Sequence, residues 1–243
     1  METPVESTGL RRDIGPVQAT SLNVANMVGI GPFITIPMFL AEMGGPQAMI
    51  AWGIAAVLVI CDGLVWAELG AALPGSGGTY HFFRRIFHGT RWGRILPFFF
   101  IWQFLFSGAM ELASGYIGAL QYLEYAVEGL KSWLEQWGVP GGMKTVAAAL
   151  ALAVTLLLCR KTASIGKLGV VLCCGTMITV IIVIVCGITH FNMSALEPPP
   201  GAWNIDGKWL GGLGGAMTIA IYDYLGYYNI CHMGDEVREP QKT

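Results

Sequence analysis

Two short stretches of the sequence combine helix-breaking residues with groups suited to binding charge. The first is Asn26-Met27-Val28-Gly29-Ile30-Gly31-Pro32, and the second is Tyr222-Asp223-Tyr224-Leu225-Gly226. Glycine costs a helix interior about 1 kcal/mol relative to alanine, and proline removes a backbone donor and clashes with the preceding turn. An interrupted helix exposes unpaired amides, which favour a carboxylate, and unpaired carbonyls, which favour an ammonium group or a cation. Together they suit a zwitterion, although a simple proline kink without a ligand is the alternative for the first stretch.

Two carboxylates stand inside otherwise apolar segments, Asp223 within residues 209–232 and Glu111 within residues 95–122. An ionisable group at membrane depth is costly unless it is paired or wet, which makes both residues functional candidates. We interpret Asp223 as the leading functional candidate and Glu111 as a second one. The structural alternative for each is a carboxyl group hydrogen-bonded between packed helices.

The elements that must position these groups are membrane-spanning helices. The chain has 243 residues, of which 54% are hydrophobic and only 12% are charged, whereas a soluble domain is about a quarter charged. The apolar residues come in blocks, and about 20 residues suffice to cross a bilayer. Six spans are predicted, at residues 17–40, 47–72, 95–122, 144–159, 168–190 and 209–232.

The basic residues predict the orientation of these spans. With the N-terminal tail (residues 1–16) in the cytoplasm, all but three of the 14 Lys and Arg residues fall on the cytoplasmic side; the three outside are Lys131, Lys144 and Lys208. This bias predicts a multi-pass protein of the cell membrane with a cytoplasmic N-terminus. Residues 191–208 then form an extracellular loop and residues 233–243 a cytoplasmic segment. Residues 79–87 read as an amphipathic surface helix, its aromatics in lipid and its arginines at the headgroups.

Several function classes find no support in the sequence. The first sixteen residues contain no apolar core, so no signal peptide is expected. The six cysteines show neither zinc spacing nor a disulfide framework, and the four histidines have no paired spacing for a metal or for nucleophilic catalysis. No basic patch indicates nucleic acid. We therefore expect no metal, no cofactor and no enzymatic activity.

Four segments in order give the chain a resemblance to a known family. They are Gly29-Ile30-Gly31, Ala41-Glu42-Met43-Gly44-Gly45-Pro46, the stretch from Ala67 to Tyr80, and Gly234-Asp235-Glu236-Val237-Arg238-Glu239-Pro240. Through them the chain resembles the amino acid–polyamine–organocation (APC) superfamily of permeases over nearly its whole length. The resemblance implies an all-α, leucine-transporter-type fold built from two inverted repeats of five helices. Residues 17–190 would form the first repeat, and the chain would be truncated after the sixth transmembrane helix or would assemble with a second chain.

The resemblance also implies a substrate site at the bilayer midplane, between the interrupted first and sixth helices. Amides around Gly29, Ile30 and Gly31 would hold a substrate carboxylate. Carbonyls near Asn26, Met27 and Val28, with those near Tyr222 and Asp223, would hold its amino group. Tyr224 and Gly226 would lie at the sixth-helix break, and Glu68 would be a cytoplasmic-side anchor. Some relatives carry a coupling lysine inside the fifth span, and its absence here leads us to Asp223 and Glu111.

These observations predict a secondary active transporter that moves amino acids across the cytoplasmic membrane by alternating access, with the proton as the candidate coupling ion and lipid as its surroundings. One alternative is a permease for polyamines or other organic cations, in which Asp223 and the neighbouring tyrosines form a cage for an amine. The alternative of another class is a non-transporting membrane sensor or assembly subunit.

Overall fold

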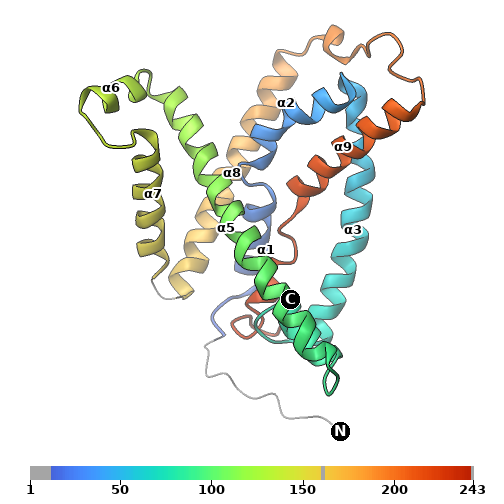
Figure 1. The fold of residues 1–243 in the computed structure, drawn as a ribbon, viewed down its shortest axis with the longest axis vertical. Coiled ribbons are helices and arrows are strands. Elements are labelled where there is room, and N and C mark those ends of the chain that lie inside the picture. The colour runs from blue at the N-terminus through green and yellow to red at the C-terminus, as the bar shows by residue number, and fades with distance from the viewer. Residues whose placement is uncertain (1–11, 160–161, 242–243) are drawn as a thin grey trace.

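The computed structural model describes residues 12–159 and 162–241, and within them the chain is helical, which confirms the predicted all-α class (Figure 1). The α-helices are α1 (Pro16–Met27), α2 (Gly31–Met43), α3 (Met49–Ala72), α4 (Thr79–Ile86), α5 (Trp92–Ala126), α6 (Leu130–Gln136), α7 (Met143–Leu158), α8 (Thr162–Thr189) and α9 (Gly207–Tyr224). Short 3-10 turns lie at η1 (Pro46–Ala48), η2 (Met193–Leu196) and η3 (Asn229–His232).

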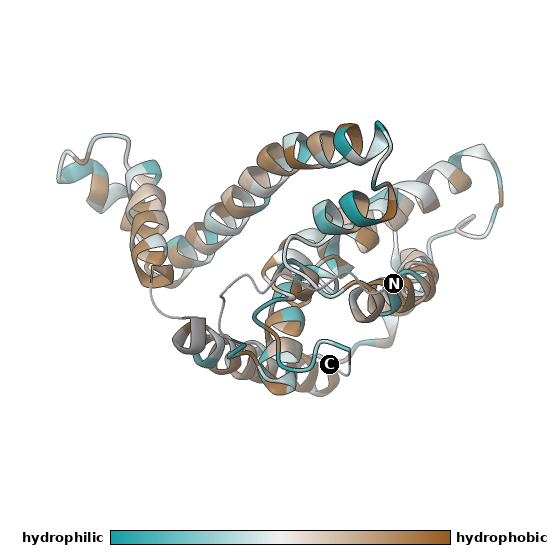
Figure 2. Cartoon of the chain, turned by 90° about the horizontal axis from the view of Figure 1, so that it is seen from below, coloured by the Kyte–Doolittle hydropathy of each residue, from teal (hydrophilic) through white to brown (hydrophobic). Residues whose placement is uncertain are grey.

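Four helical segments are long and apolar enough to cross a membrane, namely Pro16–Met43, Pro46–Ala72, Trp92–Ala126 and Ile165–Thr189. Helix α7 is apolar but shorter. Hydrophobic residues cover the helices, whereas hydrophilic residues gather towards loops and helix ends (Figure 2). The chain is a multi-pass membrane protein.

The two spans that the sequence predicted to be interrupted are interrupted in the structure. Residues 17–40 form α1 and α2, which are separated at residues 28–30. The predicted sixth span, residues 209–232, is helical only to Tyr224, and its remainder is an extended segment followed by the turn η3. Glycine and proline disfavour continuous helix at these places.

Helices α2, α3 and α9 share one core made largely of alanine. Ala51, Ala55, Ala216 and Ala220 are fully buried there with Phe39. Small side chains let helix backbones approach closely, which is how helices associate within a bilayer. The backbones come close at Gly212 of α9, where a Cβ would lie 2.6 Å from the backbone oxygen of Glu42. This core therefore determines which face α9 turns towards α2.

Three segments far apart in sequence join at one end of the molecule. The Ile14 amide donates to the Glu236 carbonyl (3.0 Å), and the Arg238 amide donates to the Ile14 carbonyl (2.8 Å). The loop after α3 joins them, because the Gly77 and Gly78 amides donate to the carbonyls of His232 and Cys231 at 3.0 and 3.1 Å. These bonds hold the chain that follows α9.

Helix α4 has the predicted amphipathic character with one difference. Arg84 and Arg85 are exposed, as expected of headgroup-facing residues, but Phe82 is only 3% exposed. Its ring packs 5.9 Å from that of Trp66 on α3 instead of facing lipid.

Helices α5, α6 and α7 form an arm to one side of the α2–α3–α9 core (Figure 1).

Candidate functional site

The first helix break leaves the start of α2 without a side-chain cap. Helix α1 ends at Met27, and α2 starts at Gly31 with Pro32 in its first turn. Ile30 occupies the N-cap position, and its side chain has no acceptor for the first amides of α2. The start of α2 thus carries the partial positive charge of the helix dipole.

The second helix break lies directly against the first. Helix α9 ends at Tyr224, Leu225 is extended, and Gly226 has a φ of 121°, a conformation that favours glycine. A Cβ at Gly226 would lie 2.6 Å from Asn26 Nδ2 and 3.1 Å from the Met27 amide nitrogen. The structure therefore brings together two of the stretches that the sequence singled out, and only glycine fits where they meet.

Asp223 reaches from α9 to the first turn of α2. Its side chain is 5% exposed, and its Oδ2 accepts a hydrogen bond from the Thr35 hydroxyl. A Cβ at Gly31 would lie 2.8 Å from Asp223 Oδ1. That Oδ1 atom is buried and has no hydrogen-bond partner within residues 12–159 and 162–241. The carboxyl group thus occupies the end of α2 where the sequence led us to expect a substrate carboxylate.

The other candidates lie in different surroundings. The Tyr222 hydroxyl is 3.4 Å from Ser114 Oγ of α5, so this side chain faces the α5 side of the break. Tyr224 packs in the core, with its ring 5.6 Å from that of Trp52. Glu111 is exposed on α5 and lies near enough to Tyr228 to act on it electrostatically. No hydrogen bond in the described part of the chain joins Glu111 to Asp223, so the two coupling candidates are separate groups.

Asn23, which the sequence analysis did not select, fastens the second break to α1. Its Nδ2 donates to the Tyr227 carbonyl at 2.7 Å, and its Oδ1 accepts from the Ile230 amide at 3.1 Å. Neither backbone group lies within an α-helix, and Ile230 is in the short turn η3, so both need such partners at membrane depth. The sequence could have indicated this role, because Asn23 is an amide side chain inside an apolar span, one turn before Asn26.

Asp62 is a second polar residue that the sequence analysis missed. It lies near the middle of α3, and its Oδ2 accepts from the Tyr227 hydroxyl and from Trp66 Nε1, the latter at 3.0 Å. The Trp66 ring stacks on Tyr228 at 5.0 Å, with 28° between the ring planes. The rule that drew attention to Asp223, a carboxylate within an apolar span, applies equally to Asp62.

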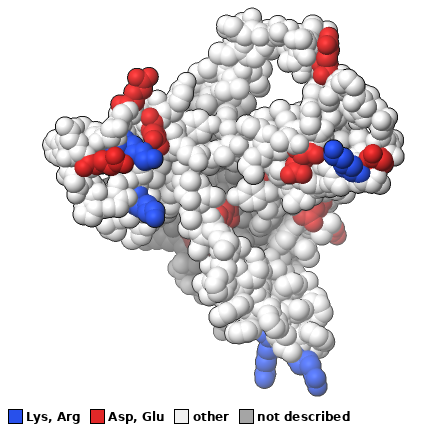
Figure 3. All heavy atoms as spheres, turned by 45° about the horizontal axis from the view of Figure 1, so that its top comes forward, with Lys and Arg blue, Asp and Glu red and all other residues white. Residues whose placement is uncertain are grey.

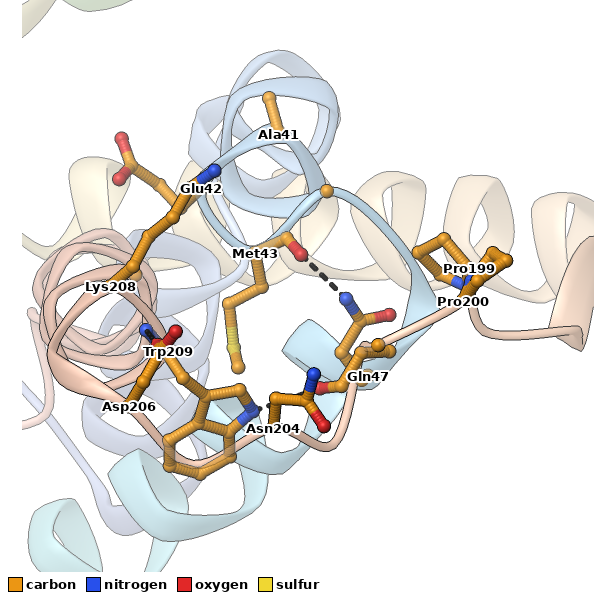
Figure 4. A pocket seen from close by; sticks show the side chains of 14 residues that line it. Ala41, Glu42, Met43, Gln47, Pro199, Pro200, Asn204, Asp206, Lys208 and Trp209 are labelled. Atoms are coloured by element: carbon orange, nitrogen blue, oxygen red, sulfur yellow. Dashed lines mark hydrogen bonds between the residues drawn. The ribbon is translucent and has the colours of Figure 1, made fainter.

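A hollow of about 440 Å³ lies away from the breaks, between the end of α2 and the start of α9 (Figure 4). Glu42, Gln47 and Lys208 line it. The Asp206 side chain caps α9 by accepting from the Trp209 amide at 2.7 Å, which fixes the α9 side of the hollow.

In the part of the chain that the structure describes, no group of three or more His, Cys, Asp or Glu side chains could hold a metal ion.

Two interrupted membrane helices in contact are typical of secondary transporters. Comparison with known proteins identifies the family. The sequence model of the amino acid permease family matches residues 14–243, so the chain belongs to that family. This membership confirms the predicted relation to the APC superfamily and its leucine-transporter-type fold.

Individual relatives are distant but match nearly the whole chain. It is 25% identical to cationic amino acid transporter 7, chloroplastic, of Arabidopsis thaliana over 98% of the chain and 41% of that protein. It is 24% identical to the mouse b(0,+)-type amino acid transporter 1, over 99% of the chain and 48% of the relative. The human large neutral amino acids transporter small subunit 2 is 23% identical, over 96% and 43%. The chain thus spans less than half the length of these relatives, and no solved structure matches it.

Proposed function

We propose that this chain belongs to a secondary active transporter that moves amino acids across the cytoplasmic membrane by alternating access, with its N-terminus in the cytoplasm and without covalent chemistry. The observation that carries the proposal is the contact between the two helix breaks, where Gly226 lies against Asn26 and Met27. Amino acid transport by the named relatives supports the substrate class. Broken helices in contact offer both amide and carbonyl groups to one small zwitterion.

Within this proposal, the amides around Gly29, Ile30 and Gly31 bind the substrate carboxylate, and the carbonyls of Asn26, Met27 and Val28 bind its amino group. The Asp223 carboxyl lies beside the same start of α2. An ionised Asp223 repels an arriving carboxylate, because two like charges would share one helix end. A protonated Asp223 removes that repulsion. Proton binding at Asp223 would then accompany amino acid binding, which makes the proton the coupling ion.

One observation favours a second candidate, a permease for polyamines or other organic cations. The Oδ1 atom of Asp223 is buried without a partner in the described structure. An ammonium group would satisfy it directly, with a charge-assisted hydrogen bond. Such a substrate needs no carboxylate and therefore no protonation of Asp223.

The test is uptake of labelled amino acids by proteoliposomes that contain the protein expressed from its complete reading frame. Gly226→Ala is expected to abolish uptake, because the new methyl group enters the contact between the two breaks. Gly211→Ala, on the same helix α9 with no atom within 4 Å of the new Cβ, is the matched control and should retain uptake. Equal uptake by both variants would contradict the site.

Competition separates the two substrate classes. If the substrate is an amino acid, unlabelled neutral amino acids should inhibit uptake and putrescine should not. The reverse result would favour the amine permease. Asp223→Asn then tests the coupling, since this variant should keep amino acid binding while uptake loses its dependence on a proton gradient.

A further inference from the structure

A second hollow, of about 640 Å³, lies at the turn between α4 and α5, far from the helix breaks. Its charged and titratable lining consists of Arg84, His88, Arg91 and Arg94, and no Asp or Glu side chain lines it. Three guanidinium groups therefore share one concave surface without an acidic partner in that lining. Figure 3 shows Lys and Arg side chains projecting from the lower end of the molecule, where this turn lies, without Asp or Glu beside them on the visible face.

The turn that holds these arginines is tightly constrained. Gly89 has a φ of 79°, and a Cβ at Gly93 would lie only 2.4 Å from the Phe87 carbonyl oxygen. The Thr90 amide and hydroxyl both donate to that same carbonyl, at 3.1 and 2.8 Å. These contacts fix the short turn between α4 and α5, so the arginines on both sides of it are presented as a group.

The local partners of the arginines leave their charge uncompensated. Arg84 contacts Tyr80, with its guanidinium carbon 5.8 Å from the ring centroid and NH1 3.4 Å from the hydroxyl, and both contacts are to a neutral side chain. Arg91 is the N-cap residue of α5, where the helix dipole adds further positive potential. This combination is suited to an anion with several acceptor oxygens.

Apolar side chains at the hollow and in the same turn indicate what kind of anion this is. Ile95 lines the hollow and is 37% exposed. Ile86 and Trp92, which flank the turn in sequence, are 55% and 52% exposed, and Trp92 begins the membrane-spanning helix α5. The arginines therefore lie where a span enters the headgroup layer, with apolar surface directly next to them. A free phosphate ion would use only the arginines, whereas a phospholipid uses both surfaces.

We propose that the α4–α5 turn binds the headgroup phosphate of an anionic phospholipid of the cytoplasmic leaflet, with its acyl chains along the first turns of α5. Arginine suits this role because its planar guanidinium donates two parallel hydrogen bonds to phosphate oxygens. The site is independent of the substrate site, so the lipid proposal stands or falls separately from the proposed transport.

The test is native mass spectrometry of the purified protein, expressed from its complete reading frame, with equal amounts of phosphatidylglycerol and phosphatidylcholine. Wild type is expected to retain phosphatidylglycerol selectively, and the triple variant Arg84→Gln, Arg91→Gln, Arg94→Gln should lose that selectivity by about thirtyfold. The matched control, Lys131→Gln, Lys144→Gln, Lys208→Gln, removes the same number of positive charges from other parts of the chain and should behave like wild type.

Two outcomes would overturn the proposal: equal retention of both lipids by wild type, or an equal loss of selectivity in both triple variants, which would indicate net charge alone. Glycerol 3-phosphate separates a lipid from a soluble phosphate. At the concentration of the lipid it should not displace phosphatidylglycerol, and displacement would show that the site binds free phosphate. Should the triple variant fail to fold, Arg84→Gln and Arg94→Gln alone should each lower retention about threefold, and unchanged retention in both would equally reject the site.

Discussion

The two helix breaks are built in different ways although they touch. The first, between α1 and α2, is produced by local residues: Gly29 and Gly31 weaken the helix, and Pro32 starts a new one. The second, after α9, is held by side chains from other helices. Asn23 of α1 binds its backbone at Tyr227 and Ile230, and Asp62 of α3 accepts from the Tyr227 hydroxyl.

This difference has a consequence for motion. The first break exposes amides without a side-chain cap, so it is suited to meet a changing ligand, and Asp223 of α9 and Tyr122 of α5 bond to α2 beside it. The second break depends on α1, α3 and the loop at Gly77, so it changes when those elements move. We therefore expect substitutions at the second break to destabilise the protein more than comparable substitutions at the first.

The largest effect is expected for Gly226→Ala. Alanine is strained at a φ of 121°, and its Cβ would lie 2.6 Å from Asn26 Nδ2, so the free energy of unfolding should fall by about 3 kcal/mol. Thermal denaturation in detergent measures this. Gly211→Ala should instead be neutral or slightly stabilising, because it lies inside α9 in open space.

Asn23→Ala should follow, with a loss of about 2 kcal/mol, because it leaves the Tyr227 carbonyl and the Ile230 amide without their partner. The same denaturation assay applies. Asn192→Ala is the matched control, since Asn192 caps only the exposed 3-10 turn η2. A larger loss for Asn192→Ala than for Asn23→Ala would reject the idea that α1 holds the second break.

Gly31→Ala tests the first break and should cost about 1 kcal/mol. Its Cβ would lie 2.8 Å from Asp223 Oδ1, but the atom it meets belongs to a side chain and not to backbone. Shortening that side chain in Asp223→Ser should remove the clash. In a double-mutant cycle the loss from Gly31→Ala should therefore be smaller in the Asp223→Ser background. If the losses in free energy of unfolding from the two substitutions were additive, Asp223 would not contact the first turn of α2 in solution.

The smallest expected effect is a pH dependence through His81, which packs on the loop that carries Gly75. Burial lowers the pKa of His81, the nearby Asp235 opposes this shift, and Arg85 and Arg84 add to it. The unfolded chain therefore binds a proton more readily than the folded one below about pH 6.5, so stability should fall as the pH decreases through that value. The slope of melting temperature between pH 7.5 and 5.5 should be shallower in His81→Gln than in wild type.

The sequence predicted much of the fold because helix interruption is a local property. Gly29, Gly31 and Pro32 disfavour continuous helix whatever surrounds them, and Gly226 marks the second interruption in the same way. The apolar blocks and the basic residues depend only on residue type, so the helical membrane architecture followed from them. Family resemblance added the pairing of the two interrupted spans, which no local pattern contains.

Tertiary packing alone decided which groups face the breaks. The fully buried alanines Ala216 and Ala220 set how closely and at what rotation α9 meets α2, and that rotation places the Asp223 carboxyl at the start of α2. It also turns Tyr224 into the core against Trp52. Asn23 and Asp62 bond to Tyr227, which lies 204 and 165 residues further along the chain. Such contacts depend on the relative rotation of whole helices, which residue types and spacing do not determine.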